Sequence, residues 1–171
     1  MTMDMKKMHE FWEIVPQIMK KIPSPGILLV SGDGIKNKNI MTIGWLQIGF
    51  IWRSPVVNVL VRESRHSYKL LQEHDEFTIN ILPDLYNKEI AFCGNQSGGF
   101  CDKFSETGLQ AKKASTVSAL ALKESEITLE CKILYRHNIN PDKLSDLILA
   151  KYYSGEDFHQ IIAASVENFE F

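Results

Sequence analysis

A short cluster of cationic and hydroxyl side chains, Arg62-Glu63-Ser64-Arg65-His66-Ser67, separates two patterned stretches of the chain. The residues before it alternate between apolar and polar, as in a strand, and Leu70 and Leu71 after it continue with helical spacing. The first turn of a helix offers unpaired N–H groups and a partial positive charge, and arginine adds donors for an anion. The cluster therefore predicts a phosphate site at a strand-to-helix junction. A simpler interpretation, in which Ser64 only caps the helix and the arginines are solvated, stays open on these residues alone.

Two glycine-containing stretches are further candidates for anion binding. Asn95-Gln96-Ser97-Gly98-Gly99 forms a glycine-rich loop, and consecutive N–H groups in such a loop can surround an anion. Ser31-Gly32-Asp33-Gly34 contains a GxG pattern, but Asn37 occupies the position at which the dinucleotide fingerprint needs its third glycine. The neighbouring pattern is strand–turn–strand, so we interpret the second stretch as a hairpin turn.

Composition excludes several classes of function. The 171 residues fit one domain, and a net charge of −2 gives no electrostatic case for nucleic acid. Apolar runs such as Ile27 to Val30 are too short to span a bilayer, and the amino-terminal residues lack the apolar core of a signal peptide. Cys93, Cys101 and Cys131 are odd in number and have no metal-ligand spacing, which predicts reduced thiols. We therefore expect a cytoplasmic protein with no metal and no membrane or nucleic-acid partner.

Periodicity predicts the elements that position these residues. A helix is expected over roughly residues 4–20, with Pro16 kinking or splitting it. Its apolar positions are Met5, Met8, Trp12, Val15 and Met19. Strands are expected at 27–30, 39–45, 57–62, 76–81, 119–122, 127–135 and within 158–171, with short helices after residues 64, 83 and 140 and a short turn of helix at 101–104.

Two of these strands carry specific expectations. Ile127, Leu129, Cys131, Ile133 and Tyr135 fall on one face of their strand, which predicts that Cys131 is a core residue. Gly44, inside another strand, either permits close approach of a ligand or marks a bulge. About seven strands joined by hairpin-like turns indicate a barrel with helices at its mouths.

The chain resembles the flavin reductase-like family of FMN-binding split-barrel proteins, and within it the flavoredoxin group. The resemblance covers roughly residues 23–165 and depends on the order and spacing of five pieces. These are Asn39-Ile40-Met41-Thr42-Ile43-Gly44-Trp45; Val61-Arg62-Glu63-Ser64-Arg65-His66-Ser67; Glu76-Phe77-Thr78-Ile79-Asn80-Ile81-Leu82; Cys93-Gly94 with Ser97-Gly98 and Asp102-Lys103-Phe104; and Glu124-Ser125 leading to Leu129-Glu130-Cys131.

The resemblance implies a mainly β fold, a Greek-key split β-barrel with short peripheral helices, in one domain covering residues 1–171. It also implies a homodimer that binds one noncovalent FMN per subunit, with the helix of residues 1–22 packing on the barrel or on the partner. Carried over to this sequence, Met41 and Thr42 lie along the isoalloxazine, with Asn39 and Ile43 on the same strand. The residues implied around the phosphate are Arg62, Ser64, His66 and Ser67. Those implied on or before the loop that closes over the cofactor are Cys93, Ser97, Asp102 and Lys103.

The implied activity is that of an NAD(P)H-dependent flavin reductase, in which hydride passes from the nicotinamide to N5 of FMN and no side chain is a nucleophile. His159 matches a histidine near the family's last strand, where nicotinamide or substrate approaches. Alternatives are an FMN electron carrier that serves a protein partner without its own nicotinamide site, or a barrel that binds no FMN. The sequence departs from the family pattern at Gly99, where an arginine is usual, and at Ala163-Ala164-Ser165-Val166 near the carboxyl terminus.

Overall fold

The computed structural model describes residues 3–34, 36–155 and 157–171. Its strands are β1 (Ile27–Gly32), β2 (Lys38–Ile43), β3 (Leu46–Ile51), β4 (Ser54–Arg62), β5 (Glu76–Ile81), β6 (Ala111–Lys113), β7 (Leu120–Leu122), β8 (Ile127–Asn138) and β9 (His159–Glu170). Its α-helices are α1 (Met5–Lys21), α2 (His66–Glu73), α3 (Asn87–Asn95), α4 (Lys103–Thr107) and α5 (Asp146–Tyr152), with 3-10 turns η1 (Asp84–Tyr86) and η2 (Pro141–Lys143). The predicted mainly β fold is therefore confirmed.

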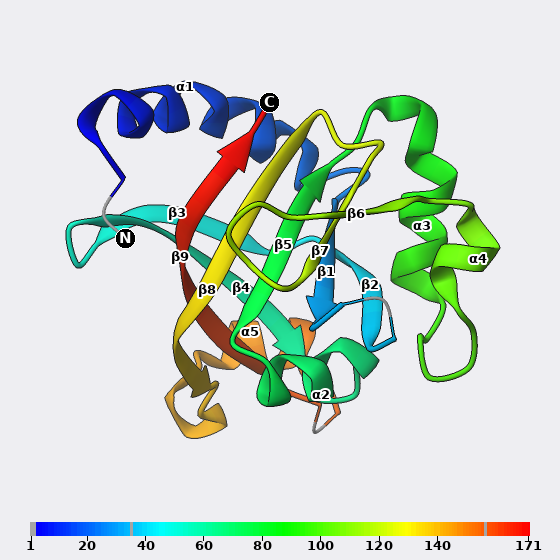
Figure 1. Ribbon diagram of the computed structural model, residues 1–171. Helices are drawn as coiled ribbons and strands as arrows, with labels where there is room; N and C mark the ends of the chain where they lie inside the picture. Colours follow the sequence, from blue (N-terminus) through cyan, green and yellow to red (C-terminus); the bar gives the residue numbers. More distant parts are fainter. Residues whose placement is uncertain (1–2, 35, 156) are drawn as a thin grey trace.

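Seven of the strands form one antiparallel sheet in the order β2-β1-β5-β8-β9-β4-β3. The two edge strands, β2 and β3, are consecutive in the chain and only Gly44 and Trp45 separate them. A connection this short can join opposite edges only if the sheet rolls up, so that the edges meet without pairing. The result is the split barrel visible in Figure 1, with the short β6–β7 hairpin beside it.

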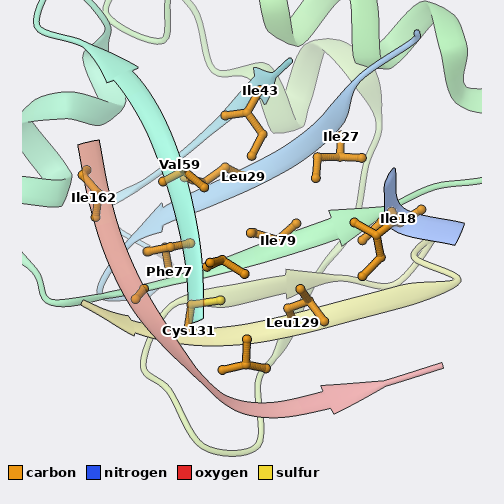
Figure 2. Close-up of a cluster of buried hydrophobic side chains, with 14 of the residues drawn as sticks. Ile18, Ile27, Leu29, Ile43, Val59, Phe77, Ile79, Leu129, Cys131 and Ile162 are labelled. Carbon is orange, nitrogen blue, oxygen red and sulfur yellow. The ribbon is translucent and has the colours of Figure 1, made fainter. Parts of the chain in front are cut away.

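The interior of the barrel is filled by alternate residues of the strands. Val57, Val59 and Val61 of β4 are fully buried, as their alternation predicts. They meet inward-facing side chains of the other strands, and Figure 2 shows part of this cluster, including Cys131 among its aliphatic neighbours. β1 is buried on both faces, because a second cluster under α3 and α4 covers its outer side.

Helix α1 lies across one end of the barrel (Figure 1) and closes its core. Asp4 caps it by accepting a hydrogen bond from the Lys7 N–H at 2.8 Å. The buried side chains are Phe11, Ile14 and Ile18. Of the predicted stripe, Trp12 and Val15 pack against the core as partly buried residues, but Met5 and Met19 are exposed, so the stripe is wrong at its ends. Apolar residues occupy a wide arc of this helix, and periodicity alone did not decide which part of the arc faces the barrel. The helix also continues through Pro16 without splitting.

The start of β4 corrects a second expectation. The strand expected at 57–62 already begins at Ser54, and the break before it lies at Trp52-Arg53. Trp52 and Arg53 have φ values of 53° and 62°, the left-handed conformation of a two-residue hairpin turn. Such turns are usually Asn-Gly or Asp-Gly, so the sequence carries no signal for this one.

The shared face predicted for β8 also needs correction at one position. Ile127, Leu129, Cys131 and Ile133 are buried, but Tyr135 is 55% exposed. A shift in the β8–β9 register between Ile133 and Tyr135 accounts for the difference. An irregularity of this kind inserts a residue into one strand and moves the following side chains to the opposite face.

Candidate functional site

A group of polar side chains gathers between the edge strand β2 and the end of β4. A cavity of about 340 Å³ lies there, between β2, the end of β4, the start of α2 and the loop after α3. Its lining residues are Asn39, Met41, Thr42, Arg62, Ser64, Arg65, His66, Ser67, Gly94, Gln96, Ser97, Gly98, Lys103 and Asp157. We call this cavity the anion cavity, because the described residues that line it include three cations and one carboxylate.

A smaller cavity of about 140 Å³ continues along β2. It shares Met41, Thr42, Arg62 and Arg65 with the anion cavity. The other residues of its wall are Ile43, Gly44, Trp45, Leu60, Val61 and His159. Gly44 therefore lies in the wall of a cavity, and a Cβ atom there would meet no neighbouring atom within 4 Å. Both cavities together follow the edge strand from Asn39 to Trp45, and we call the smaller one the His159 cavity.

The predicted cap of α2 is wrong. The helix begins at His66, its N-cap residue is Arg65, and no side chain caps it. Ser64 instead donates its hydroxyl hydrogen bond to Asp157 Oδ2 at 2.7 Å, across the cavity wall. No side chain therefore caps the N–H groups in the first turn of α2, and this turn lies at the edge of the anion cavity.

Ser67 and Asn39 join α2 to the edge strand. The Asn39 side-chain amide donates to Ser67 Oγ at 2.8 Å, and both residues are buried. Gly98 packs closely against the same amide, since a Cβ atom at this position would lie 1.9 Å from Asn39 Oδ1. Only glycine permits this close approach to Asn39. The contact holds the loop of residues 96–99 over the cavity.

Lys103 is the most deeply buried cation of the site, with 4% of its surface exposed. Its ammonium donates to the Ile40 carbonyl at 2.8 Å and to the Cys93 carbonyl at 2.7 Å. Burial lowers the pKa of Lys103, because the charged form loses its hydration. The side chain ties β2 to α3 and places a positive charge beneath the anion cavity.

The two arginines are held by main-chain carbonyls. Arg62 donates to the carbonyls of Asp157 and Tyr152 at 2.5 and 3.0 Å, and its guanidinium lies 5.4 Å from the centre of the Tyr153 ring. Arg65 donates to the Gly94 carbonyl at 3.0 Å from the opposite wall. Each guanidinium has five donors, so both can still offer N–H groups to an anion between them.

His159 lies in the wall of the smaller cavity and is 9% exposed. Its Nδ1 is 2.8 Å from the Tyr153 hydroxyl, and its ring lies 4.6 Å from the ring of Trp45. Burial, followed by the nearby Arg62 charge, lowers the pKa of His159 to about 4. At neutral pH the imidazole is therefore uncharged and can donate or accept a hydrogen bond.

Most of the predicted cofactor-binding residues come together in the anion cavity. They are Asn39, Met41, Thr42, Arg62, Ser64, His66, Ser67, Ser97 and Lys103. Ile43 lies in the wall of the His159 cavity. The binding roles of all these residues remain predictions. A cavity residue that sequence reasoning missed is Asp157, whose position in a loop before β9 carries no local signal.

Asp102 and Cys93 do not line the anion cavity. Asp102 caps α4 by accepting from the Phe104 N–H at 3.0 Å and from the Ser105 hydroxyl at 2.8 Å. The hydrogen bond from Ser105 is the main reason that the pKa of Asp102 is lowered. The Cys93 side chain belongs to the apolar cluster under α3, and only its carbonyl reaches the site through Lys103.

The cysteines near the site are expected to be unreactive. Burial raises the pKa of the Cys93 thiol to about 11, so the nucleophilic thiolate is scarce at neutral pH. Replacing Cys93 with alanine and Cys101 with serine should leave flavin affinity within about threefold, measured by fluorescence titration. A hundredfold loss, about 2.7 kcal/mol of binding free energy, would contradict this expectation.

Comparison with known proteins gives the class that this fold and site define. Residues 19–171 match the family described as flavin reductase like domain, and the chain belongs to this family. A comparison with curated proteins finds no match.

Solved structures of similar fold include a flavoredoxin, an FMN-binding protein and a monooxygenase component. Flavoredoxin of Desulfovibrio vulgaris (Miyazaki F) has a TM-score of 0.67 at 23% identity, over 85% of this chain and 68% of that one. An FMN-binding protein from Thermus thermophilus with bound 1-cyclohex-2-enone gives 0.64 at 18% identity, over 85% and 70%. Nitrilotriacetate monooxygenase component B from Bacillus cereus gives 0.68 at 15% identity, over 99% and 80%. At these identities the likeness shows the shared fold.

Within residues 3–34, 36–155 and 157–171, no helix is long and apolar enough to cross a bilayer. Across the same ranges, no three His, Cys, Asp or Glu side chains are grouped so that they could hold a metal ion.

Proposed function

We propose that this chain binds FMN noncovalently along β2 and acts as an NAD(P)H-dependent flavin reductase. The observation that carries the proposal is the anion cavity, in which, among the described lining residues, the cations Arg62, Arg65 and Lys103 outnumber the carboxylate of Asp157. Hydroxyl donors from Ser67 and Ser97 line the same space. This donor set suits the phosphate of a flavin mononucleotide. Flavin-binding relatives of the same fold support the proposal.

The remaining residues suit the planar part of the cofactor. Met41 and Thr42 line both cavities, Ile43 lines the His159 cavity, and Gly44 has no side chain to obstruct a ring beside it. Main-chain groups at an open sheet edge are free to hydrogen-bond a heterocycle, because the edge of β2 is unpaired on this side. FMN held along β2 would supply a hydride acceptor for NAD(P)H, and the neutral His159 would orient the incoming molecule by a hydrogen bond.

Spectroscopy of the purified chain tests this function. We expect absorption bands of oxidised flavin, at once or after incubation with FMN, and bleaching when NADH or NADPH is added without oxygen. Failure to bind FMN under saturating conditions would overturn the proposal, because every later step depends on the bound cofactor.

One observation favours a second function, that of an FMN electron carrier without its own nicotinamide site. The His159 cavity, at about 140 Å³, is smaller than the roughly 300 Å³ at which ligand pockets usually begin. A carrier needs only an exposed flavin edge that a protein partner can approach. Flavin bands that persist with NADH and NADPH, but bleach with a reduced protein donor, would support this alternative.

The phosphate assignment makes a separate prediction. Replacing Arg65 and Ser97 with alanine should weaken FMN binding about tenfold, or about 1.4 kcal/mol, because riboflavin lacks the phosphate to which these two side chains would donate. Riboflavin binding should change less than about threefold in the same titration. Lys20→Ala, which removes an exposed cation on α1, is the matched control for overall charge. Equal weakening of FMN and riboflavin would place the phosphate elsewhere.

The proposal also includes a cytoplasmic homodimer. Phe50, Ile51 and Trp52 at the β3–β4 hairpin are exposed, and Trp52 is 64% exposed. Apolar side chains gathered on a hairpin tip favour association with another surface. Sedimentation or light scattering of the purified chain should give twice the monomer mass, and a monomer at micromolar concentration would contradict this.

A further inference from the structure

Asp157 places a carboxylate among the donors of the anion cavity. Its Oδ1 accepts from the Ser64 main-chain N–H at 3.2 Å, and its Oδ2 accepts from the Ser64 hydroxyl at 2.7 Å. Oδ2 also lies 3.7 Å from Arg62 Nη1. One main-chain N–H, one hydroxyl and one guanidinium therefore surround this carboxylate.

The same three groups are those that bind phosphate oxygens in proteins. While Asp157 accepts both hydrogen bonds from Ser64, these donors are engaged and a negative charge faces the rest of the cavity. A phosphate that enters must either avoid this wall or displace the carboxylate, because two anions cannot share one set of donors without repulsion.

The main chain around Asp157 favours displacement of the side chain alone. Arg62 holds the Asp157 carbonyl at 2.5 Å, so the backbone is fixed independently of the carboxylate. The side chain of Asp157 is 37% exposed, which leaves room for it to rotate into solvent. Rotation would free Ser64 and leave Arg62 in place.

We propose that Asp157 is a specificity-determining residue, an internal anion that competes with the cofactor's phosphate for Ser64 and Arg62. This inference rests on the proposed FMN site. It means that the chain selects FMN over riboflavin less strongly than its cations alone would allow, because FMN must displace the carboxylate and riboflavin need not. The competition depends on the carboxylate of Asp157 alone, so that a single substitution at this position removes it.

Asp157→Asn tests the proposal. The amide oxygen can still accept from Ser64, so the loop keeps a contact, but the negative charge is gone. The dissociation constants of FMN and riboflavin would be measured by fluorescence titration for the parent chain and the variant. We expect FMN to bind about tenfold tighter to the variant, about 1.4 kcal/mol, with riboflavin changed less than about threefold. Asp142→Asn in η2 removes the same charge from an exposed position outside the cavity and should leave both constants unchanged.

The outcomes separate this inference from the proposed function. Equal or weaker FMN binding by the Asp157 variant, or equal tightening of both flavins, would overturn the role of Asp157 and leave the FMN site intact. Binding of neither flavin by parent or variant would overturn the FMN site itself. A crystal structure of the FMN complex gives a second criterion, because a carboxylate still bonded to Ser64 would also refute the competition.

Discussion

Replacing Lys103 with methionine should lower the free energy of unfolding by about 3 kcal/mol and weaken FMN binding by at least about tenfold. The methionine side chain fills a similar volume but has no donor. The carbonyls of Ile40 and Cys93, which accept from the ammonium at 2.8 and 2.7 Å, would lose this partner inside the protein. A buried carbonyl without a partner costs about 1–3 kcal/mol, and part of that cost is offset because the buried charge disappears.

The weaker binding has a separate cause. Lys103 is one of three cations that line the anion cavity, and it also holds β2 against α3, so its loss removes charge and loosens one wall. Denaturant unfolding and flavin titration measure the two effects. Lys69→Met, at an exposed position on α2, is the control and should change stability by less than about 0.5 kcal/mol. An unfolding free energy for Lys103→Met within about 1 kcal/mol of the parent would mean that the two carbonyls find other partners.

Between pH 7.5 and pH 5 the chain should lose about 2 kcal/mol of stability through His159 alone. The pKa of His159 is about 4 in the folded protein and its ordinary value is 6.5, so the unfolded chain takes up a proton first as the pH falls. The folded state therefore becomes less favourable between pH 6.5 and about 4, and the loss levels off below that range.

His159→Gln should remove this part of the pH dependence. Its neutral amide cannot be protonated, so the difference in unfolding free energy between pH 7.5 and pH 5 should shrink by about 2 kcal/mol. Measurements at pH 5 stay above the range in which Glu130 is protonated, because hydrogen bonds from Thr116, Ser115 and Asn168 keep the pKa of Glu130 low despite its burial. His9→Gln, at an exposed position on α1, is the control. An unchanged slope in the His159 variant would show that the imidazole becomes charged without loss of the fold.

The chain's sequence was enough to predict much of the barrel and many of the residues at the candidate site. The alternation of Val57, Val59 and Val61 predicted a strand with one buried face, and those side chains are fully buried. Such patterns are local, because a strand with one face in the core must alternate whatever its partners are. The ordered motifs also indicated the family, and they named Asn39, Thr42, Ser67, Ser97 and Lys103, which the fold brings to one cavity.

Only the tertiary structure decided how those residues are bonded. Ser64 has the right type and spacing for a helix cap, yet its hydroxyl bonds to Asp157, which is far away in the chain. Lys103 looked like a loop cation and instead bridges two carbonyls of other elements. The face of α1 that meets the barrel, and the left-handed turn at Trp52-Arg53, were likewise invisible in the sequence pattern.

The physical reason is the same in each case. Periodicity and turn chemistry report the environment of a residue relative to its near neighbours, so they predict strands and candidate donors. A hydrogen bond between Ser64 and Asp157 depends on strand register, on how the sheet closes and on where the loop before β9 returns. Those are properties of the whole barrel, and no short stretch of sequence contains them.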